Sequence, residues 1–280
     1  MVADRITIGN VEVLAVIDMV PPPRNPEDFF TDVPLDAWGP YEADHLESGQ
    51  LQLYYGCFTL RSQGQVVMVD TGMGPGPHPT RGNRRGDMLN QLKRLGVNPD
   101  DVTTVVHTHL HADHVGWNVT LEGGKPRATF PRARYLVPRA DWEHFTNPSV
   151  LKTTLYIAEC VVPLEGLGCM ELIEGEHAIT SEISTVATPG HTPGHVNVII
   201  TSQGQRGAVV GDVFHSKVQI REPGWCSRAD LDKELGLKSR EAMLERFERE
   251  GFIVAAGHFK PDEHFGRVVR LRGRSYWQVV

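Results

Sequence analysis

The chain alternates short apolar segments with polar turns, a pattern that predicts a protein rich in strands. Residues 6–8 and 11–17 are mostly apolar and flank Gly9-Asn10, a dipeptide typical of a tight hairpin. The apolar segments 103–106, 183–187 and 253–256 predict three further strands. Four more are expected at 57–60, 66–69, 196–200 and 208–210.

The turn sequence Ser-Gln-Gly-Gln occurs twice, at 62–65 and at 202–205. Each copy lies between two predicted strands, and the second strand leads to an aspartate, Asp70 in one case and Asp212 in the other. This weak internal repeat is consistent with two related β-rich halves. We expect a single domain over residues 1–280, with halves at about 1–170 and 171–280.

Helices are predicted at 87–95, 149–159 and 239–250. Asp87 is expected to cap the first helix and Gly96 to end it, and Gly251 is expected to end the last. Strands interrupted by helices, in two halves, predict an α/β fold in which two sheets pack face to face with helices outside.

Composition and charge narrow the functional classes. The chain has 280 residues, 40% of them hydrophobic, which is enough for a substantial core. Its formal net charge of −7 disfavours nucleic acid as the main partner. Arginines 81, 84 and 85 lie in a Gly/Pro-containing loop, and we interpret them as solvated rather than as a phosphate-binding patch.

The cysteines and the N-terminus bear on the cellular compartment. Cys57, Cys160, Cys169 and Cys226 form no Cys-x-x-Cys pair, so free thiols in a reducing compartment are expected. No segment reaches the roughly 20 apolar residues of a membrane span, and the first residues lack a signal-peptide pattern. We therefore expect a cytoplasmic protein of a bacterium-like cell, without a membrane partner.

The strongest chemical signal is the segment 109–114, His-Leu-His-Ala-Asp-His, which follows a predicted strand. A loop that leaves a strand end lets its side chains converge on an ion. Imidazole and carboxylate together suit zinc, iron or manganese, and this loop holds more ligands than one tetrahedral ion needs. The surplus indicates two metals.

Three further candidates each follow a predicted strand. His191 lies in a turn punctuated by proline and glycine, Asp212 ends an apolar strand after Gly211, and His258 follows Gly257 in the same way. Any one of them alone is typical of a hydrogen-bonded residue at a strand end. Together with the segment 109–114 they indicate a metal centre.

At this point the chain resembles the metallo-β-lactamase superfamily. The His-x-His-x-Asp-His motif of that family stands here at 109–114, and the later ligands match in the family's order over nearly the whole chain. The resemblance implies an αββα sandwich with the site along one edge. It also implies two metal ions that share a carboxylate, with these ligands: His109, His111 and His191 for the first, Asp113, His114 and His258 for the second, and Asp212 for the bridge.

Residues just outside the ligands are expected to orient them. Asp70 in the segment Val-Asp-Thr-Gly resembles the family's strand-end aspartate that supports a ligand histidine. His215 is expected to lie beside the ligands in the same role. His107 is interpreted as a packed or supporting histidine rather than a ligand.

Hydrolysis is the chemistry that the residues favour. Two divalent metals, most simply Zn²⁺, lower the pKa of a shared water and present a bridging hydroxide to a carbonyl or phosphoryl centre. Asp113 is the candidate for proton transfer. The chain contains neither a Gly-x-Ser-x-Gly elbow nor a Gly-x-Gly-x-x-Gly fingerprint, so a serine nucleophile or a dinucleotide lacks sequence support.

Departures from other branches of the family favour a lactonase or esterase. Zinc β-lactamases of the common type carry a cysteine where Asp212 stands, and the RNA-processing branches carry large insertions. The Gly-His-Thr-Pro-Gly-His segment at 190–195 is similar to the lactonase and organophosphate-hydrolase branch. His215 and Gln219 are closer to the methyl parathion hydrolase-like group, because homoserine lactonases usually have a tyrosine near position 215.

The substrate is expected to be a small molecule, uncharged and partly apolar. The region 21–55 is rich in aromatic residues, so it either packs as a buried meander or supplies a hydrophobic substrate wall. Phe29, Phe30 and Trp117 are the candidates for that wall. The sequence leaves a homodimer open.

Other functions stay open at this stage. A phosphotriester (organophosphate) hydrolase of the same fold is the main alternative, and a β-lactamase-like hydrolase is a weaker one. An iron-dependent oxidation enzyme would use similar ligands. So would a metal-binding sensor without catalysis.

Overall fold

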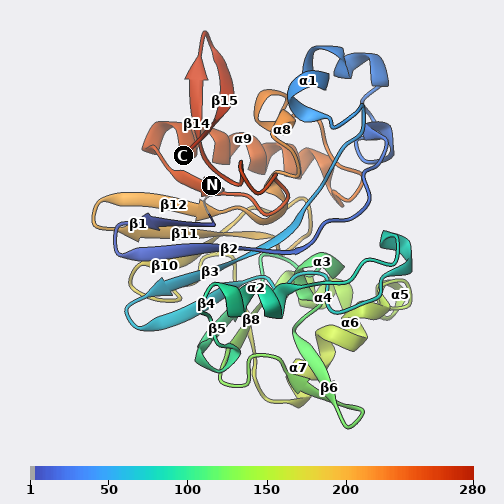
Figure 1. Ribbon diagram of the computed structural model, residues 1–280, viewed down its shortest axis with the longest axis vertical. Helices are drawn as coiled ribbons and strands as arrows, with labels where there is room; N and C mark the ends of the chain where they lie inside the picture. Colours follow the sequence, from blue (N-terminus) through green and yellow to red (C-terminus); the bar gives the residue numbers. More distant parts are fainter. Residues whose placement is uncertain (1–3) are drawn as a thin grey trace.

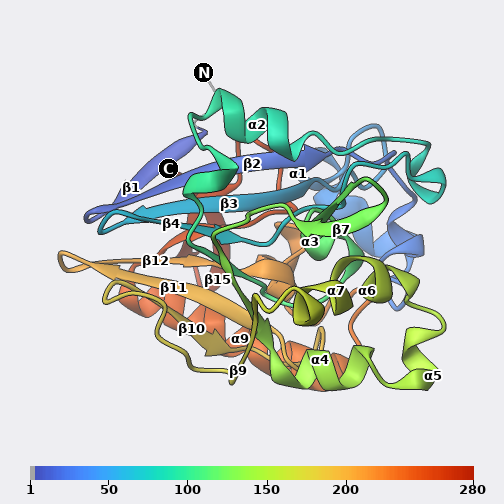
Figure 2. The same ribbon diagram turned by 90° about the horizontal axis from the view of Figure 1, so that it is seen from below.

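Two β-sheets packed face to face form the centre of the computed structural model, which describes residues 4–280, and helices cover their outer faces (Figures 1 and 2). This is the αββα arrangement expected from the sequence. The first sheet has the order β1 (Arg5–Ile8), β2 (Val11–Met19), β3 (Tyr55–Ser62), β4 (Gln65–Val69), β5 (Thr104–Val106), β8 (Arg134–Pro138), β9 (Met170–Ile173).

The second sheet contains the remaining long strands of the chain. Its order is β10 (Ile183–Ala187), β11 (Val196–Ser202), β12 (Gln205–Val209), β13 (Ile253–Ala255), β14 (Phe265–Leu271), β15 (Arg274–Val279). A separate hairpin is formed by β6 (Val119–Glu122) and β7 (Lys125–Ala128). Within the described residues, the chain therefore completes the first sheet before it begins the second.

The helices are short, except for one. They are α1 (Glu42–His45), α2 (Met88–Arg94), α3 (Ala112–Val115), α4 (Arg139–Phe145), α5 (Pro148–Leu151), α6 (Leu155–Cys160), α7 (Val162–Gly166), α8 (Val218–Arg221) and α9 (Lys233–Glu250). In Figure 2, α2 lies over the outer face of the first sheet and α9 over that of the second. None of the helices in residues 4–280 has the length and apolar character to cross a membrane.

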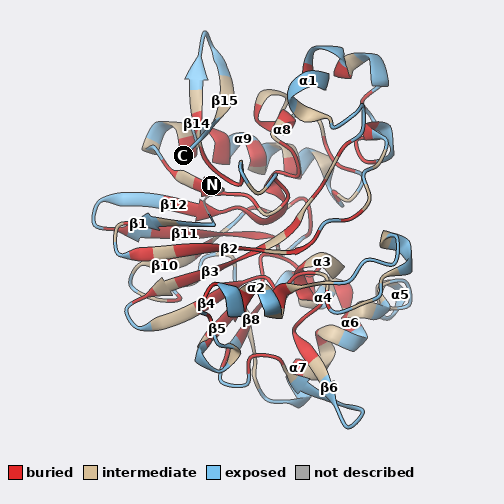
Figure 3. Ribbon diagram, in the orientation of Figure 1, coloured by how far each residue is buried: buried red, intermediate tan, exposed pale blue. Residues whose placement is uncertain are grey.

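The central part of strand β2, residues 13–17, is apolar at every position because both of its faces are covered. Val13 and Ala15 face the core between the two sheets, whereas Leu14 and Val16 pack into the cluster beneath α2. Because successive side chains of a strand point to opposite faces, a strand covered on both sides needs apolar residues throughout. The buried colouring of the central strands follows this pattern (Figure 3).

The two Ser-Gln-Gly-Gln segments form equivalent hairpins. Gln63 and Gly64 have φ of 53° and 76°, and Gln203 and Gly204 have φ of 49° and 73°. Positive φ at both central residues is what a two-residue hairpin with native twist requires. The second strand of each hairpin pairs in parallel with the next strand of its sheet, β4 with β5 and β12 with β13. Asp70 and Asp212 therefore follow equivalent strand ends in the two halves.

Two helix predictions need correction. The segment predicted as one helix over 149–159 is two, α5 and α6, because the hydroxyls of Thr153 and Thr154 donate to the carbonyl of Val150 (2.8 and 3.0 Å) and compete with the helical backbone. Helix α9 begins at Lys233, six residues before the predicted start. The Asp232 side chain caps it by accepting from Leu235 N (2.9 Å).

The aromatic N-terminal region is mainly a packed structure. Phe30 and Trp38 are buried and lie against Trp225, with ring centroids 6.4 and 4.8 Å apart. Val218 of α8 joins the same cluster. This region therefore closes one end of the molecule beside α8, and most of its aromatic rings contribute to stability. The four cysteines are free thiols, as the absence of paired spacing indicates.

Asp18, which the sequence analysis did not single out, joins several loops at the end of β2. Its carboxylate accepts hydrogen bonds from the backbone N–H groups of Met73 and Gly74, at 2.7 and 3.3 Å. It also accepts from Met88 N, at the start of α2 (2.9 Å), and from the indole of Trp117 (2.8 Å). The loop after Asp70 and the chain after the histidine-rich segment are thus fixed to one buried group.

We expect Asp18→Ala to lower the free energy of unfolding by about 3–5 kcal/mol, because it leaves several buried donors without an acceptor. Urea unfolding followed by circular dichroism measures the change. Asp100→Ala is the matched control, since Asp100 is exposed and its carboxylate forms no hydrogen bond or ion pair with residues 4–280, and its effect should stay within about 0.5 kcal/mol. Equal stability of the two variants would show that Asp18 has no such role.

Candidate metal centre

The candidate ligands lie in loops that follow strands of both sheets. The segment 109–114 follows β5, His191 follows β10, Asp212 follows β12 and His258 follows β13. These strand ends meet at one edge of the sandwich, so residues up to 149 positions apart in sequence become neighbours. The structure brings all seven predicted ligands together there.

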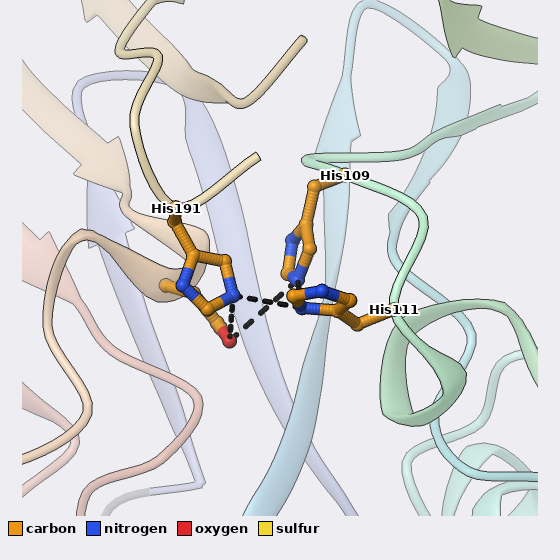
Figure 4. Close-up of side chains that lie close together, drawn as sticks. His109, His111 and His191 are labelled. Carbon is orange, nitrogen blue, oxygen red and sulfur yellow. Dashed lines mark hydrogen bonds and ion pairs between the residues drawn. The ribbon is translucent and has the colours of Figure 1, made fainter. Parts of the chain in front are cut away.

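The first group of donors contains three histidines and one carboxylate. His111 Nδ1 lies 3.1 Å from His109 Nε2 and 2.8 Å from His191 Nε2. Asp212 Oδ2 lies 3.1 Å from His191 Nε2 and 3.6 Å from His109 Nε2. Figure 4 shows the three rings pointing toward one another from opposite sides of the site. Separations of this size are those between neighbouring ligands of one tetrahedral ion with metal–ligand bonds of about 2.0–2.2 Å.

The second group is formed by Asp113, His114 and His258, with the other oxygen of Asp212. Asp212 Oδ1 lies 3.1 Å from His114 Nε2 and 3.0 Å from His258 Nε2. The Asp113 oxygens are 4.0 Å from each of these two nitrogens. Asp212 therefore directs one oxygen to each group, which is the geometry of a bridging carboxylate.

The donors fit metal ions better than they fit one another. His114 Nε2, His258 Nε2 and Asp212 Oδ1 are buried and lack a hydrogen-bond partner with suitable geometry. Buried polar atoms are normally satisfied, and three such atoms that face one another indicate a ligand between them. Their chemistry, imidazole and carboxylate, suits divalent zinc, iron or manganese.

The outer nitrogens of His114, His191 and His258 are held by hydrogen bonds, which leaves their inner nitrogens for a metal. His114 Nδ1 donates to Asp70 Oδ2 (2.9 Å), and His191 Nδ1 donates to Asp230 Oδ1 (2.7 Å). His258 Nδ1 donates to the carbonyl of Tyr54 (2.7 Å). Such partners select the tautomer whose other nitrogen carries the lone pair.

Asp70 orients histidines of both groups. Besides the bond from His114, it accepts from the backbone N–H of Thr108 (2.8 Å) and from its hydroxyl (2.7 Å). The Thr108 hydroxyl oxygen in turn accepts a hydrogen bond from His109 Nδ1 (3.0 Å). Burial raises the pKa of Asp70, but His114 and the nearby His107, 3.8 Å away, outweigh it and lower this pKa to about 2. The carboxylate is therefore ionised and acts as an acceptor.

Electrostatics within the groups is consistent with this arrangement. Burial and the neighbouring His114 hold the pKa of His109 well below its usual value, and burial and His191 do the same for His111. Both imidazoles are thus neutral and have a free lone pair. Burial raises the pKa of Asp212, but the facing charges of His258 and His114 outweigh it and hold this pKa well below its usual range.

Two supporting carboxylates carry no signal in the sequence. The Asp230 carboxylate accepts hydrogen bonds from Ser227 and pairs with the buried Arg240. Burial raises the pKa of Asp230, but the hydrogen bond from His191 and its charge outweigh burial and lower this pKa. Asp141 in α4 accepts from Leu110 N (3.0 Å) and Gly194 N (2.6 Å). It therefore joins the two loops that carry His111 and His191. Both aspartates lie far in sequence from the groups they support, and nothing local marks them.

The remaining predicted residues divide into two sets. His215 Nε2 lies 3.1 Å from Asp212 Oδ2, and its ring stacks on His258 with centroids 5.2 Å apart. Phe29 contacts His215 edge to face at 5.1 Å. Phe30 instead is fully buried in the N-terminal cluster, and Trp117 is packed beneath α2 with its indole bound to Asp18. Those two side chains are structural, so the expectation that they wall the pocket is not met.

A cavity of about 270 Å³ opens directly onto the metal centre. It reaches both groups of donors, and a larger cavity of about 480 Å³ adjoins His215 and His258. The smaller cavity has these lining residues: Arg24, Phe29, Leu53, Tyr55, Arg81, His111, Ala112, Asp113, Tyr156, Asp212, His215, Arg228, Ala229 and His258. Tyr55 belongs to the aromatic region 21–55 that the sequence offered as a possible wall, whereas Tyr156 and the arginines were not expected there, because they lie in different segments without a shared motif.

The fold and the paired donor groups define an αββα protein with a candidate dinuclear metal centre. The sequence model of the metallo-beta-lactamase superfamily matches residues 57–258, and the chain belongs to this superfamily.

Relatives of known name agree with that assignment. The N-acyl homoserine lactonase AiiA of Bacillus thuringiensis subsp. kurstaki is 28% identical over 233 residues, which are 78% of this chain and 86% of AiiA. The N-acyl homoserine lactonase AttM of Rhizobium radiobacter is 31% identical over 121 residues, 40% of this chain and 41% of AttM.

Solved structures show the same fold over almost the full length. AbOPH, a hydrolase in the beta lactamase superfamily, superimposes with a TM-score of 0.83 at 24% identity and covers 99% of this chain and 96% of its own. AidC, described as a dizinc quorum-quenching lactonase, superimposes with a TM-score of 0.81 at 19% identity and the same coverage.

We expect Asp212→Ala to reduce the metal content from two ions per chain to one or fewer, because one carboxylate serves both groups. Elemental analysis of protein dialysed against a trace of divalent metal gives the stoichiometry. The exposed Asp100→Ala variant should retain the full content. Two ions per chain in Asp212→Ala would remove Asp212 from the bridging role.

Removal of the supporting carboxylates should weaken metal binding in different ways. Asp70→Ala should lower the affinity by about 10- to 100-fold at both sites, since Asp70 orients His114 directly and His109 through Thr108. Asp230→Ala should affect only the site that contains His191. Competition with a chromophoric chelator resolves the two affinities. An unchanged affinity in Asp70→Ala would assign Asp70 to strand-end packing.

Proposed function

We propose that this protein is a dinuclear metal-dependent hydrolase that opens lactones or cleaves esters. The observation that carries the proposal is the Asp212 carboxylate, which directs one oxygen to each of two histidine-rich donor groups. Relatives that match most of the chain are named N-acyl homoserine lactonases, and they support a lactone as the substrate.

Zinc is the proposed metal at both positions. Histidine nitrogen and carboxylate oxygen are ordinary zinc ligands, and the structural neighbour AidC is described as a dizinc lactonase. When bound, two such ions polarise a carbonyl oxygen and lower the pKa of a shared water toward about 7.

The residues of the chain hold and order this chemistry. Four of the five candidate ligand histidines are at most 4% exposed, namely His109, His114, His191 and His258, whereas His111 is partly exposed and lines the cavity. The Asp113 side chain is 19% exposed and also lines the cavity. We assign proton transfer to the Asp113 carboxylate, which reaches both the cavity and the second donor group.

His215 is proposed to fix the bridge. Its Nε2 donates to Asp212 Oδ2 (3.1 Å), and its backbone N–H is held by the side chain of Gln219 (2.7 Å). Gln219 also donates to the carbonyl of Trp225 (2.9 Å), which ties the bridge to the N-terminal aromatic cluster. Held in this way, Asp212 would keep a fixed orientation toward both donor groups.

The cavity fits a small molecule. About 270 Å³ is near the lower end of the roughly 300–1,000 Å³ found for ligand pockets. Phe29, Leu53 and Tyr55 supply a partly apolar wall for the uncharged carbons around the reacting carbonyl. The seven candidate ligands all come from one chain, so the centre does not require a second copy. The homodimer and the cytoplasmic location stay predictions of the sequence.

Phosphotriester hydrolysis is the second candidate. The same centre would act on a phosphoryl oxygen, and the His215–Gln219 unit that the sequence associates with the methyl parathion hydrolase-like group is present as a hydrogen-bonded pair. Lactones are placed first because the relatives of higher coverage are named for that activity.

A substrate panel tests the proposed function. Purified zinc-loaded protein should hydrolyse a γ-lactone or an aryl ester faster than a phosphotriester, a phosphodiester or a β-lactam, with kcat/KM measured for each. A chelator should abolish the activity and Zn²⁺ should restore it. A phosphodiester or β-lactam hydrolysed much faster than every lactone or ester would contradict the lactonase proposal. Oxygen consumption by iron-loaded protein would instead indicate an oxidation enzyme.

A further inference from the structure

Three arginines surround the cavity that opens onto the metal centre. Arg24, Arg81 and Arg228 come from three distant segments of the chain and line the same 270 Å³ space as Asp113 and His111. The whole protein has a formal net charge of −7, so this cluster is not a local sample of a basic surface. Arg81, interpreted from the sequence as solvated, therefore lies at the site.

None of these arginines forms an ion pair with a carboxylate among residues 4–280. Arg81 Nε donates to the hydroxyl of Tyr55 (2.8 Å), and Arg228 Nη1 donates to the backbone carbonyl of Asp28 (3.2 Å). The Arg24 guanidinium lies 5.6 Å from the centroid of the Phe29 ring. Each side chain is thus positioned by a neutral partner, and its guanidinium is free of an ion pair although Asp113 and Asp212 line the same cavity.

The contacts connect the arginines to the reacting centre. Tyr55, which receives the bond from Arg81, lies edge to face with the ligand His258 at 5.9 Å. Phe29, below Arg24, lies 5.1 Å from His215. One layer of aromatic rings therefore separates the cations from the metal ligands. A small substrate whose reacting carbonyl is at the metals would extend its far end to the arginines.

We propose that the substrate carries a carboxylate at the end remote from the reacting carbonyl, and that Arg24, Arg81 and Arg228 bind it. This deepens the proposed function and rests on it for the reacting group. Guanidinium groups match a carboxylate with paired, charge-assisted hydrogen bonds. The expectation of an uncharged substrate depended on Trp117 and on the aromatic N-terminal region, and the structure buries most of those rings away from the cavity.

The test compares two lactones of equal size. The probes are γ-butyrolactones whose ring carries a short alkyl chain that ends either in a carboxylate or in the corresponding carboxamide, which has the same shape without the charge. The zinc-loaded protein should show a kcat/KM about 10-fold higher for the carboxylate at low ionic strength, and the ratio should fall with added salt. A ratio of one or below would overturn the proposal.

Single variants assign the preference to the cavity. Arg81→Gln and Arg228→Gln should each reduce the carboxylate-to-carboxamide ratio severalfold, since each removes one guanidinium charge from the cavity wall. Arg84→Gln is the matched control, because Arg84 is an exposed arginine of the same loop as Arg81 and does not line the cavity, and it should keep the wild-type ratio. A ratio that is the same in all four proteins would also overturn the proposal.

A binding measurement separates this proposal from the proposed function. Isothermal titration calorimetry with the hydrolysed, ring-opened forms of both probes reports recognition without turnover. Tighter binding of the form with the additional carboxylate, lost in Arg81→Gln, supports the arginine site even if neither lactone is hydrolysed. Equal binding of the two forms contradicts the arginine site even if both lactones are hydrolysed.

Discussion

The structure depends on the placement of one buried carboxylate between two sets of histidine nitrogens. Asp212 is 3.0–3.1 Å from three candidate ligand imidazoles on different loops, and donor atoms at those separations need a metal ion or a proton between them. The supporting bonds to Asp70, Asp230 and the Tyr54 carbonyl hold the rings in place.

The sandwich tolerates a buried polar centre because the apolar core that stabilises the fold lies elsewhere. Apolar clusters between the sheets and beneath α2 and α9 stabilise the scaffold without any contribution from the site. The loops at one edge are then fixed by polar groups of their own, such as Asp18 and Asp141. A rigid scaffold that carries functional loops separates the interactions that fold the chain from those that hold the metals.

The site has a general inner part and a particular outer part. The candidate ligands and their supporting carboxylates lie within residues 57–258, the part that matches the superfamily, and a metal centre there would act on any carbonyl or phosphoryl group that reaches it. The cavity wall differs from this inner part in its residue types, since it combines aromatic rings with arginines from distant segments that form no ion pair within residues 4–280. Selection among substrates therefore belongs to the wall, and the proposed carboxylate preference is a property of that outer part.

The sequence by itself determined the layered fold and the set of candidate ligands, because both follow from local patterns of residues. The six-residue segment 109–114 and the strand-end Asp212 and His258 can be read directly, as can the hairpins at the repeated Ser-Gln-Gly-Gln turns. Only the tertiary structure decided the roles of Asp230, Arg81 and Trp117. Each depends on partners far away in the chain, His191, Tyr55 and Asp18, and local composition carries no record of which distant loops will meet at a sheet edge.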